Sequence, residues 1–200
     1  IFSYEEPENF KPDQYRTGGI KVPLTDKTLC LMTRDMPYKY LKYLQALCFS
    51  GFVLALDQAT KLYIHTSMKV GENFPVIPHF FDIQYVRNQG GAFGLFSDSH
   101  EYIRWVLFLV FPVFCMGLIF SILRDTTNKL QVTALGFIFG GAIGNYIDRV
   151  RLGYVIDFID WYVKDFHWPI FNIADSFIVV GVFILIVFYF LERKTPPATK

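Results

Sequence analysis

The sequence predicts an all-α membrane protein of four transmembrane helices, with a small extracytoplasmic β element between the first two helices. The 200-residue chain is 52% hydrophobic and contains 22 Phe and 12 Tyr, a composition better suited to lipid than to a soluble core. In addition, several apolar runs are each close to the roughly 20 residues that a helix needs to cross a bilayer. These runs cover residues 41–62, 103–123, 130–147 and 177–191.

Residues 1–37 differ from the rest of the chain. They are polar, contain four prolines and show no hydrophobic period. Such a segment buries too little apolar surface to offset the entropy of ordering it. We therefore expect a mostly disordered N-terminal arm or extension, a membrane domain over residues 38–194, and a short C-terminal tail over residues 195–200.

The connections between the apolar runs differ in length. About forty residues separate the first two runs, and within them Phe80–Val86 reads as a strand because apolar side chains recur along it. The connection over 124–129 is short and predicts a tight turn. The connection over 148–176 is longer and carries Asp, Trp and Asn residues.

The order of the runs places their ends on definite sides of the membrane. The first run exits on one side, the second returns, the third exits again, and the fourth begins where the third ended. Residues 57–61, 145–149 and 172–175 should therefore share one face with the 65–102 connection. Lys and Arg residues are nearly balanced between the two sides, but those near the 124–129 turn lie in short flanks, which favours that side as cytoplasmic.

Two of the polar segments on the shared face each allow two interpretations. Asp57 and Lys61 are four residues apart, which suits an intrahelical ion pair. Because charge beside a bilayer is costly, the same pair is also typical of a site. Asn88 and Gly90 suit a glycine turn that closes a strand, or a loop whose bare backbone lets a peptide approach.

A glycine-rich segment opens the third polar cluster. Gly140, Gly141 and Gly144 predict close packing between helices. Packing alone does not explain the polar residues that follow at the end of the same run, which are Asn145, Asp148 and Arg149.

Carboxylates at these membrane ends suggest acid–base chemistry. Two carboxylates brought together where water is restricted cannot both ionise easily, so one keeps a proton and the other stays charged. One can draw a proton from an attacking water while the other protonates a peptide carbonyl. This is the scheme of the aspartic peptidases, and it requires neither metal nor cofactor.

Other chemistries fit the sequence less well. The four histidines are scattered and form no His-Glu-x-x-His pattern, so we expect no metal site. There is no Gly-x-Ser-x-Gly motif for a serine nucleophile. The net charge of +1 and the lack of a basic stripe argue against nucleic acid as a partner.

Two functions from other classes compete with a peptidase. A proton-coupled small membrane carrier would use membrane-end carboxylates as relay groups, but it predicts them at the midplane or on both faces. The order of the runs places them on one face. A non-catalytic assembly scaffold would explain the small residues of the helix but not the carboxylates.

The motifs together resemble those of a known family. From about residue 39 to residue 193 the chain is similar to the bacterial lipoprotein signal peptidases, also called signal peptidase II. Each motif alone is weak, whereas the ordered set at these spacings is highly specific. The set is Asp57-x-x-Thr-Lys61, Asn88-x-Gly90-x-Ala-Phe93, Gly140-Gly-x-x-Gly-Asn145-x-x-Asp148-Arg149, Val155-Ile-Asp157-Phe and Phe171-Asn172-x-Ala-Asp175-Ser.

The resemblance implies an enzyme of the bacterial inner membrane with cytoplasmic termini and a site toward the outer face. It implies an aspartic endopeptidase that cuts the signal peptide of a diacylglyceryl-modified prolipoprotein just before the lipid-bearing cysteine. Membrane lipid and inhibitors of the globomycin type are further expected partners.

The resemblance also implies roles for individual residues. Asp157 and Asp175 would be the catalytic pair. Asp148 is an alternative first member, but its neighbour Arg149 should keep it permanently charged, so we assign Asp157. The residues expected to bind substrate or shape the site are Asp57, Lys61, Asn88, Gly90, Asn145, Asp148, Arg149 and Asn172.

Overall fold

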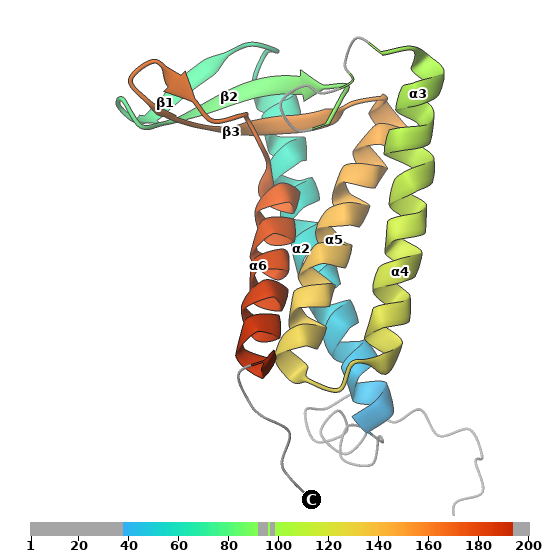
Figure 1. The fold of residues 1–200 in the computed structure, drawn as a ribbon. Helices are drawn as coiled ribbons and strands as arrows, with labels where there is room; N and C mark the ends of the chain where they lie inside the picture. The colour runs from blue at the N-terminus through green and yellow to red at the C-terminus, as the bar shows by residue number, and fades with distance from the viewer. Residues whose placement is uncertain (1–37, 92–95, 97–98, 194–200) are drawn as a thin grey trace, which may run out of the picture. The chain divides into compact units, whose positions relative to one another are not determined.

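Long helices stand side by side with a small sheet across one end (Figure 1). The computed structural model describes residues 38–91, 96 and 99–193. The predicted arm over 1–37 and the tail over 195–200 lie outside the described residues. The helical segments are α2 (Tyr38–Ser67), then α3 (Glu101–Trp105), the π-helical turn η3 (Val106–Val110) and α4 (Phe111–Asp125) in direct succession, α5 (Lys129–Leu152) and α6 (Ile173–Arg193).

The helices extend beyond the apolar runs at both ends. α2 continues to Ser67, five residues past the predicted end, and α6 begins at Ile173, four residues before the predicted start. Hydropathy marks only the part of a helix that suits lipid, whereas backbone hydrogen bonding continues into polar residues at the membrane surface. The extra turn of α6 carries Asp175, and α5 continues past its predicted end at residue 147 to Leu152 and carries Asp148 and Arg149 there.

Three helical segments of the described chain are long and apolar enough to cross a membrane, namely Glu101–Asp125, Lys129–Leu152 and Ile173–Glu192. Three of the four predicted runs, 103–123, 130–147 and 177–191, thus lie in helices that are long and apolar enough to span a membrane. α2 is 30 residues long, or about 45 Å at the usual helical rise. It does not meet the same apolar standard because polar residues such as Lys42, Gln45, Asp57 and Lys61 interrupt its run.

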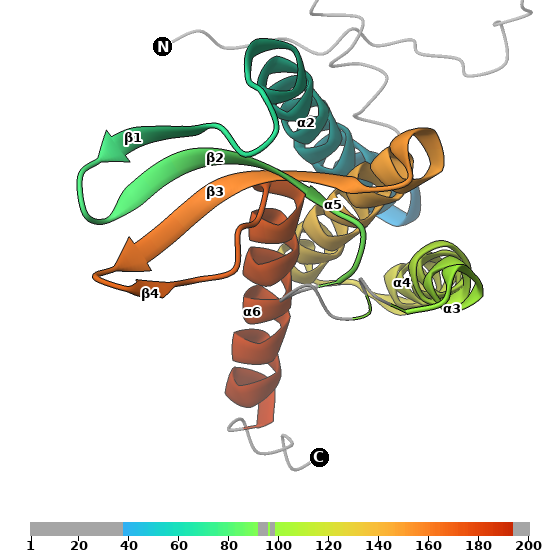
Figure 2. The same ribbon diagram turned by 90° about the horizontal axis from the view of Figure 1, so that it is seen from above.

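The sheet is antiparallel with strand order β1-β2-β3-β4. Seen from above, its strands spread across the ends of the helices (Figure 2). β1 (Asn73–Ile77) and β2 (Phe81–Asn88) come from the first long connection, where β2 confirms the predicted strand. β3 (Val155–Val163) and β4 (Phe166–His167) come from the connection between α5 and α6. The β element is therefore not confined to the region between the first two helices.

Glycines let α5 pack closely against α2 and α6. A Cβ atom at Gly140 would lie 2.6 Å from the backbone oxygen of Ser50 on α2, and one at Gly141 would lie 2.5 Å from the backbone oxygen of Ala174 on α6. Only a residue without a side chain allows backbones to approach this closely. The predicted role of these glycines in helix packing is confirmed.

We predict that Gly140→Ala destabilises the fold by about 1–3 kcal/mol, because the added methyl group would overlap the α2 backbone. The measurement is the thermal unfolding midpoint in detergent. Gly117→Ala in α4 is the matched control, since a Cβ there meets nothing within 4 Å. Equal midpoints for the two variants would contradict the packing account.

Candidate active site

The polar residues singled out from the sequence meet where the sheet crosses the helix ends. Every expected site residue belongs to one connected set of hydrogen bonds and ion pairs, as the order of the helices predicts. Its members are Asp57 and Lys61 from α2, Asn88 at the end of β2 and Gly90 just after it, Asn145, Asp148 and Arg149 from α5, Asp157 from β3, Asn172 just before α6 and Asp175 in its first turn.

Lys61 is the centre of this set. Its Nζ atom lies 2.9 Å from Asp57 Oδ2, 3.0 Å from Asp148 Oδ2 and 2.8 Å from Asn145 Oδ1. An ammonium group has three N–H donors, so each has one acceptor. The residue is only 1% exposed, and a buried charge requires such complete pairing.

The two carboxylates around Lys61 connect it to other elements. Asp57 Oδ1 accepts a hydrogen bond from the backbone N–H of Ala174, at 2.9 Å, which joins α2 to the first turn of α6. Asp148 Oδ2 accepts one from the backbone N–H of Ile156, at 3.2 Å, which joins α5 to β3. A Cβ atom at Gly144 would collide with the Asp57 carboxylate. The absence of a side chain at Gly144 therefore leaves space for the Asp57 carboxylate of α2.

Gln58 is a part of this set that the sequence analysis missed. Its Nε2 atom lies 3.0 Å from Asp148 Oδ1 and 3.2 Å from Asp57 Oδ2, so one amide bridges both carboxylates. It is a polar residue beside Asp57 in an otherwise apolar run, and that position is the signal that would have identified it.

Asp157 is held by two amide groups. Asn172 Nδ2 donates to Asp157 Oδ1 at 2.7 Å, and Asn88 Nδ2 donates to Oδ2 at 2.9 Å. The Asn88 oxygen accepts from the backbone N–H of Gly90 at 2.9 Å, which orients the amide nitrogen toward Asp157. The glycine turn thus closes the strand and also positions a donor.

Asp175 lies in the first turn of α6. Its Oδ2 atom accepts from the backbone N–H of Asn172 at 3.3 Å, while the Asn172 oxygen accepts from the backbone N–H of Asp175 at 3.0 Å. This reciprocal arrangement is a capping box. Its Oδ1 atom accepts from Asn145 Nδ2 at 2.7 Å. A helix N-terminus stabilises negative charge at this position.

Asn145 and Asn172 connect Lys61 to both carboxylates. The Asn145 oxygen faces the Lys61 ammonium, so its amide nitrogen must face Asp175. The Asn172 nitrogen donates both to Asp157 and, at 3.1 Å, to the Asn145 oxygen. Each amide can make these bonds in one orientation only. Asp157 and Asp175 are therefore brought together from β3 and α6 with fixed, different partners.

The environment of Asp157 favours its protonated form. The residue is 2% exposed. Burial, followed by the nearby negative charge of Asp175, raises the pKa of Asp157 to about 6, although the hydrogen bonds from Asn88 and Asn172 and the charge of Lys61 act in the opposite direction. The two carboxylates of the site thus differ in environment, because Asp157 is buried on a strand whereas Asp175 lies at a helix N-terminus.

The ion-pair partner of Asp148 is Lys61 rather than its sequence neighbour Arg149. Side chains of adjacent helical residues point in different directions, and Lys61 provides the positive charge next to Asp148 instead. The Arg149 guanidinium donates to the carbonyl oxygens of Asn145, at 3.3 Å, and Gly90, at 3.2 Å, and lies 5.0 Å from the centre of the Phe108 ring.

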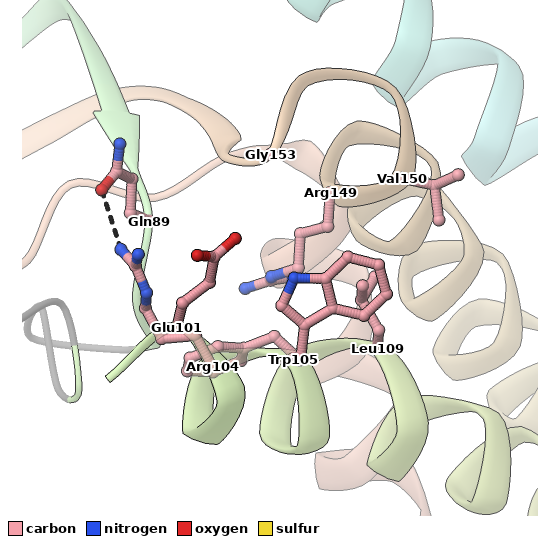
Figure 3. Close-up of a pocket in the computed structure, with 9 residues that line it drawn as sticks. Gln89, Glu101, Arg104, Trp105, Leu109, Arg149, Val150 and Gly153 are labelled. Carbon is pink, nitrogen blue, oxygen red and sulfur yellow. Dashed lines mark hydrogen bonds between the residues drawn. The ribbon is translucent and has the colours of Figure 1, made fainter. Parts of the chain in front are cut away.

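A cavity of about 330 Å³ opens beside Arg149, between α5 and the α3–η3 segment. Figure 3 shows the Arg149 guanidinium pointing into it, toward Glu101 and Trp105. Arg104, at the same wall, donates to Gln89 Oε1 at 3.0 Å. The cavity is lined by both charged and apolar side chains, so it can contact polar and apolar groups of the same ligand.

The described residues contain no group of three or more His, Cys, Asp and Glu side chains that could hold a metal ion. The chemistry that the arrangement itself supports is proton transfer between two carboxyl groups and a substrate.

Comparisons with known proteins agree on one family. The model of the family described as signal peptidase (SPase) II matches residues 49–191. The lipoprotein signal peptidase of Geobacter sulfurreducens is 48% identical over 148 residues, covering 72% of this chain and 91% of that protein. The lipoprotein signal peptidase of Desulforapulum autotrophicum is 40% identical over 149 residues, covering 74% and 91%.

Solved structures give the same result for the fold. One, described as "Bacterial membrane enzyme structure by the in meso method at 2.3 A resolution", matches with a TM-score of 0.70 and 34% identity, covering 78% of this chain and 93% of that one. A second bacterial membrane enzyme structure, obtained by the same method, has a TM-score of 0.65 and 35% identity, covering 75% and 94%.

We predict that Lys61→Met destabilises the fold by about 3–5 kcal/mol, because it leaves two buried carboxylates without their cation. The thermal unfolding midpoint in detergent tests this. Lys69→Met, at the exposed end of the first connection, is the control and should leave the midpoint almost unchanged. A Lys61→Met variant as stable as that control would show that the network does not hold the helices together.

The raised pKa of Asp157 predicts a pH-dependent stability difference between the wild type and Asp157→Asn. The folded protein holds the Asp157 proton more tightly than the unfolded chain does. The contribution of Asp157 to the free energy of unfolding is therefore complete below the ordinary pKa of an aspartate, and it is lost as the pH rises through about 6. The variant should therefore gain stability relative to the wild type between about pH 4 and pH 7, by up to about 3 kcal/mol. A difference that stays constant with pH would contradict this prediction.

Proposed function

The chain belongs to the signal peptidase II family, and we propose that Asp157 and Asp175 are its catalytic pair. Members of this family are membrane-bound aspartic endopeptidases that remove the signal peptide from prolipoproteins, and the chain is such an enzyme. Nothing in the comparisons supports a proton-coupled carrier. The observation that carries the residue assignment is that β3 and α6 present two carboxylates in unlike environments. Asn172 links them, because its side-chain amide donates to Asp157 and its backbone N–H donates to the Asp175 carboxylate.

The two carboxyl groups have separate roles at the start of the reaction. Asp157 begins with its proton, because burial disfavours its charged form. Asp175 begins as a carboxylate, with its charge stabilised by the start of α6 and by the Asn145 amide. Asp175 takes a proton from water as the water oxygen attacks the scissile carbonyl carbon, and Asp157 gives its proton to the carbonyl oxygen.

The second half of the reaction returns both protons. The tetrahedral diol collapses as Asp175 gives a proton to the leaving amine nitrogen and the C–N bond breaks. Asp157 takes back a proton from a diol hydroxyl as the new carboxyl group forms. The pair ends in its starting protonation state, so it needs no further reactant than one water molecule.

The surrounding polar residues divide into two groups. Asn88, Asn145 and Asn172 use their amide N–H groups on the carboxylates, so we assign them positioning roles. Asp57, Lys61 and Asp148 hold the helices around them. Arg149 has five N–H donors, and the structure directs it toward both Gly90 and the cavity. We therefore assign Arg149 to bind a carbonyl group of the substrate.

The orientation in the membrane follows from the charges at the opposite end of the bundle. Lys42 donates to the carbonyl oxygens of Arg124, at 2.5 Å, and Thr126, at 2.9 Å, where α4 ends. Arg124 and Lys129 flank the same short turn. Positive charge in short loops favours the cytoplasmic side. In our proposal α2 is the fourth membrane span, the termini are cytoplasmic, and the carboxylate pair lies at the outer face of the inner membrane.

The substrates in this proposal are prolipoproteins that carry a diacylglyceryl group on the cysteine after the cleaved bond. Their acyl chains stay in the bilayer against the apolar helices, and the lipid is a handle for specificity. Each methylene buried in a matched groove contributes about 0.8 kcal/mol. Inhibitors of the globomycin type would bind at the same place.

We predict that Asp157→Asn and Asp175→Asn each lower kcat for a lipid-modified prolipoprotein by about 10²–10⁴-fold or more. Cleavage by purified protein in detergent is the measurement. Asp160→Asn is the matched control, because Asp160 is an equally buried carboxylate on β3 outside the pair, and it should stay within a few-fold of wild type. Normal cleavage by either pair variant would refute the assignment, and cleavage of an unlipidated twin at the same rate would refute the role of the lipid.

We predict a falling limb in the pH profile of kcat/KM near pH 6. Above the pKa of Asp157 the enzyme loses the proton that it must give to the carbonyl oxygen, and the rate should fall by about tenfold for each further pH unit. The profile belongs to the coupled pair rather than to one group. A rate that rises from pH 6 to pH 8 would exclude Asp157 as the initial acid.

A further inference from the structure

The part of the sheet that lies farthest from the catalytic pair has one apolar and one polar face. Successive side chains of a strand point to opposite faces, so Ile159, Trp161 and Val163 share a face with Asp157 on β3. The edge-to-face contact of Trp161 with Phe171, at 5.2 Å, supports this assignment. Phe171 pairs with Ile159 and lies directly before Asn172, which contacts Asp157.

The neighbouring strands add apolar residues to the same face. Phe81 pairs with Trp161, and Ile83 pairs with Ile159. Across the next pair of strands Phe74 faces Ile83. On the other side Val163 faces Phe166 of β4. We call this set the overhanging face, with members Phe74, Phe81, Ile83, Trp161, Val163 and Phe166.

The opposite face is polar and internally hydrogen-bonded. Asp82 and Asp160 are paired there across β2 and β3. Asp82 accepts hydrogen bonds from Asn73 Nδ2, at 2.8 Å, and from the Tyr162 hydroxyl, at 3.1 Å. Asp160 lies 3.0 Å from Nδ1 of His167. The sheet is therefore amphipathic where it leaves the helices.

Four of the six members of the overhanging face are exposed and the other two, Phe81 and Ile83, are half-buried. By the alternation along β3 the face points the way that Asp157 points, toward the helix ends. Trp161 is 50% exposed, Val163 60% and Phe166 68%. Figures 1 and 2 show the strands extending sideways beyond α6. Below them α6 presents exposed apolar side chains, among them Val179 and Phe183, on a segment apolar enough to cross a membrane. Phe171, which contacts Trp161, lies two residues before α6 begins, so it connects the overhanging face to this helix along the chain.

We propose that the overhanging face lies on the bilayer, in the interfacial region of the leaflet next to the catalytic pair. The inference goes beyond the proposed function and requires only that the helices cross the membrane. Tryptophan and phenylalanine are favoured at this depth, and the polar face, with its hydrogen-bonded carboxylates, is turned away from the lipid. Trp161 and Asp157 lie on the same face of one strand, about 13 Å apart along it. Contact of Trp161 with lipid therefore fixes the height of Asp157 above the bilayer.

The test is the depth of single tryptophans in liposomes. Trp105→Phe with Trp168→Phe leaves Trp161 as the only tryptophan of the three in the sequence. A matched protein adds Trp161→Phe and Tyr162→Trp, which moves the indole by one residue to the polar face. Each protein is reconstituted in phosphatidylcholine liposomes with acyl chains brominated near the headgroup or near the methyl end.

We expect chains brominated near the headgroup to quench most of the Trp161 emission, and chains brominated near the methyl end to quench less. The indole at position 162 should show little quenching by either lipid. Equal quenching at both positions, or none at Trp161, would overturn the proposal. A blue-shifted but unquenched Trp161 would also overturn it, because protein such as a second copy of the chain would then cover the face. These readouts do not depend on cleavage, so they remain valid if the peptidase assignment fails.

Discussion

The burial of one ammonium group between two carboxylates is the constraint on which the rest of the structure depends. Lys61 has to keep all three of its N–H groups paired away from water, and its partners come from α2 and α5. This pairing requires α2 and α5 to lie so close together that only glycines fit at their contact positions on α5. It also fixes the orientation of the Asn145 amide, which in turn directs a donor at Asp175. A charge with no role in proton transfer thereby organises the groups that have one.

The proposed chemistry depends on an asymmetry between two like residues. Asp157 projects from a buried strand and is surrounded by neutral amides. Asp175 lies at a helix N-terminus, where backbone dipoles favour negative charge. Neither environment alone makes an acid and a base. Their combination does, because the charge on Asp175 further disfavours a second charge on Asp157.

Much of this arrangement was predictable from the sequence, for reasons that also explain what was not. The alternation of sides along four apolar runs predicts that 57–61, 145–149 and 172–175 meet, and their contacts confirm it. Strand β3 was missed because it is buried on both faces near the bundle and interrupted by Asp157 and Asp160, so no simple period marks it. The sequence did not identify the ion-pair partner of Asp148, because Lys61 lies on another helix and reaches Asp148 only through the packing of α2 against α5.

The most direct test of this account is infrared difference spectroscopy of the carboxyl C=O stretch, recorded for the wild type, Asp157→Asn and Asp148→Asn between pH 5 and pH 8. The account predicts a protonated-carboxyl band that disappears on raising the pH through about 6 in the wild type. The band should be absent in Asp157→Asn and retained in Asp148→Asn. A band that survives in Asp157→Asn, or that is lost only in Asp148→Asn, would contradict the assignment of the proton to Asp157.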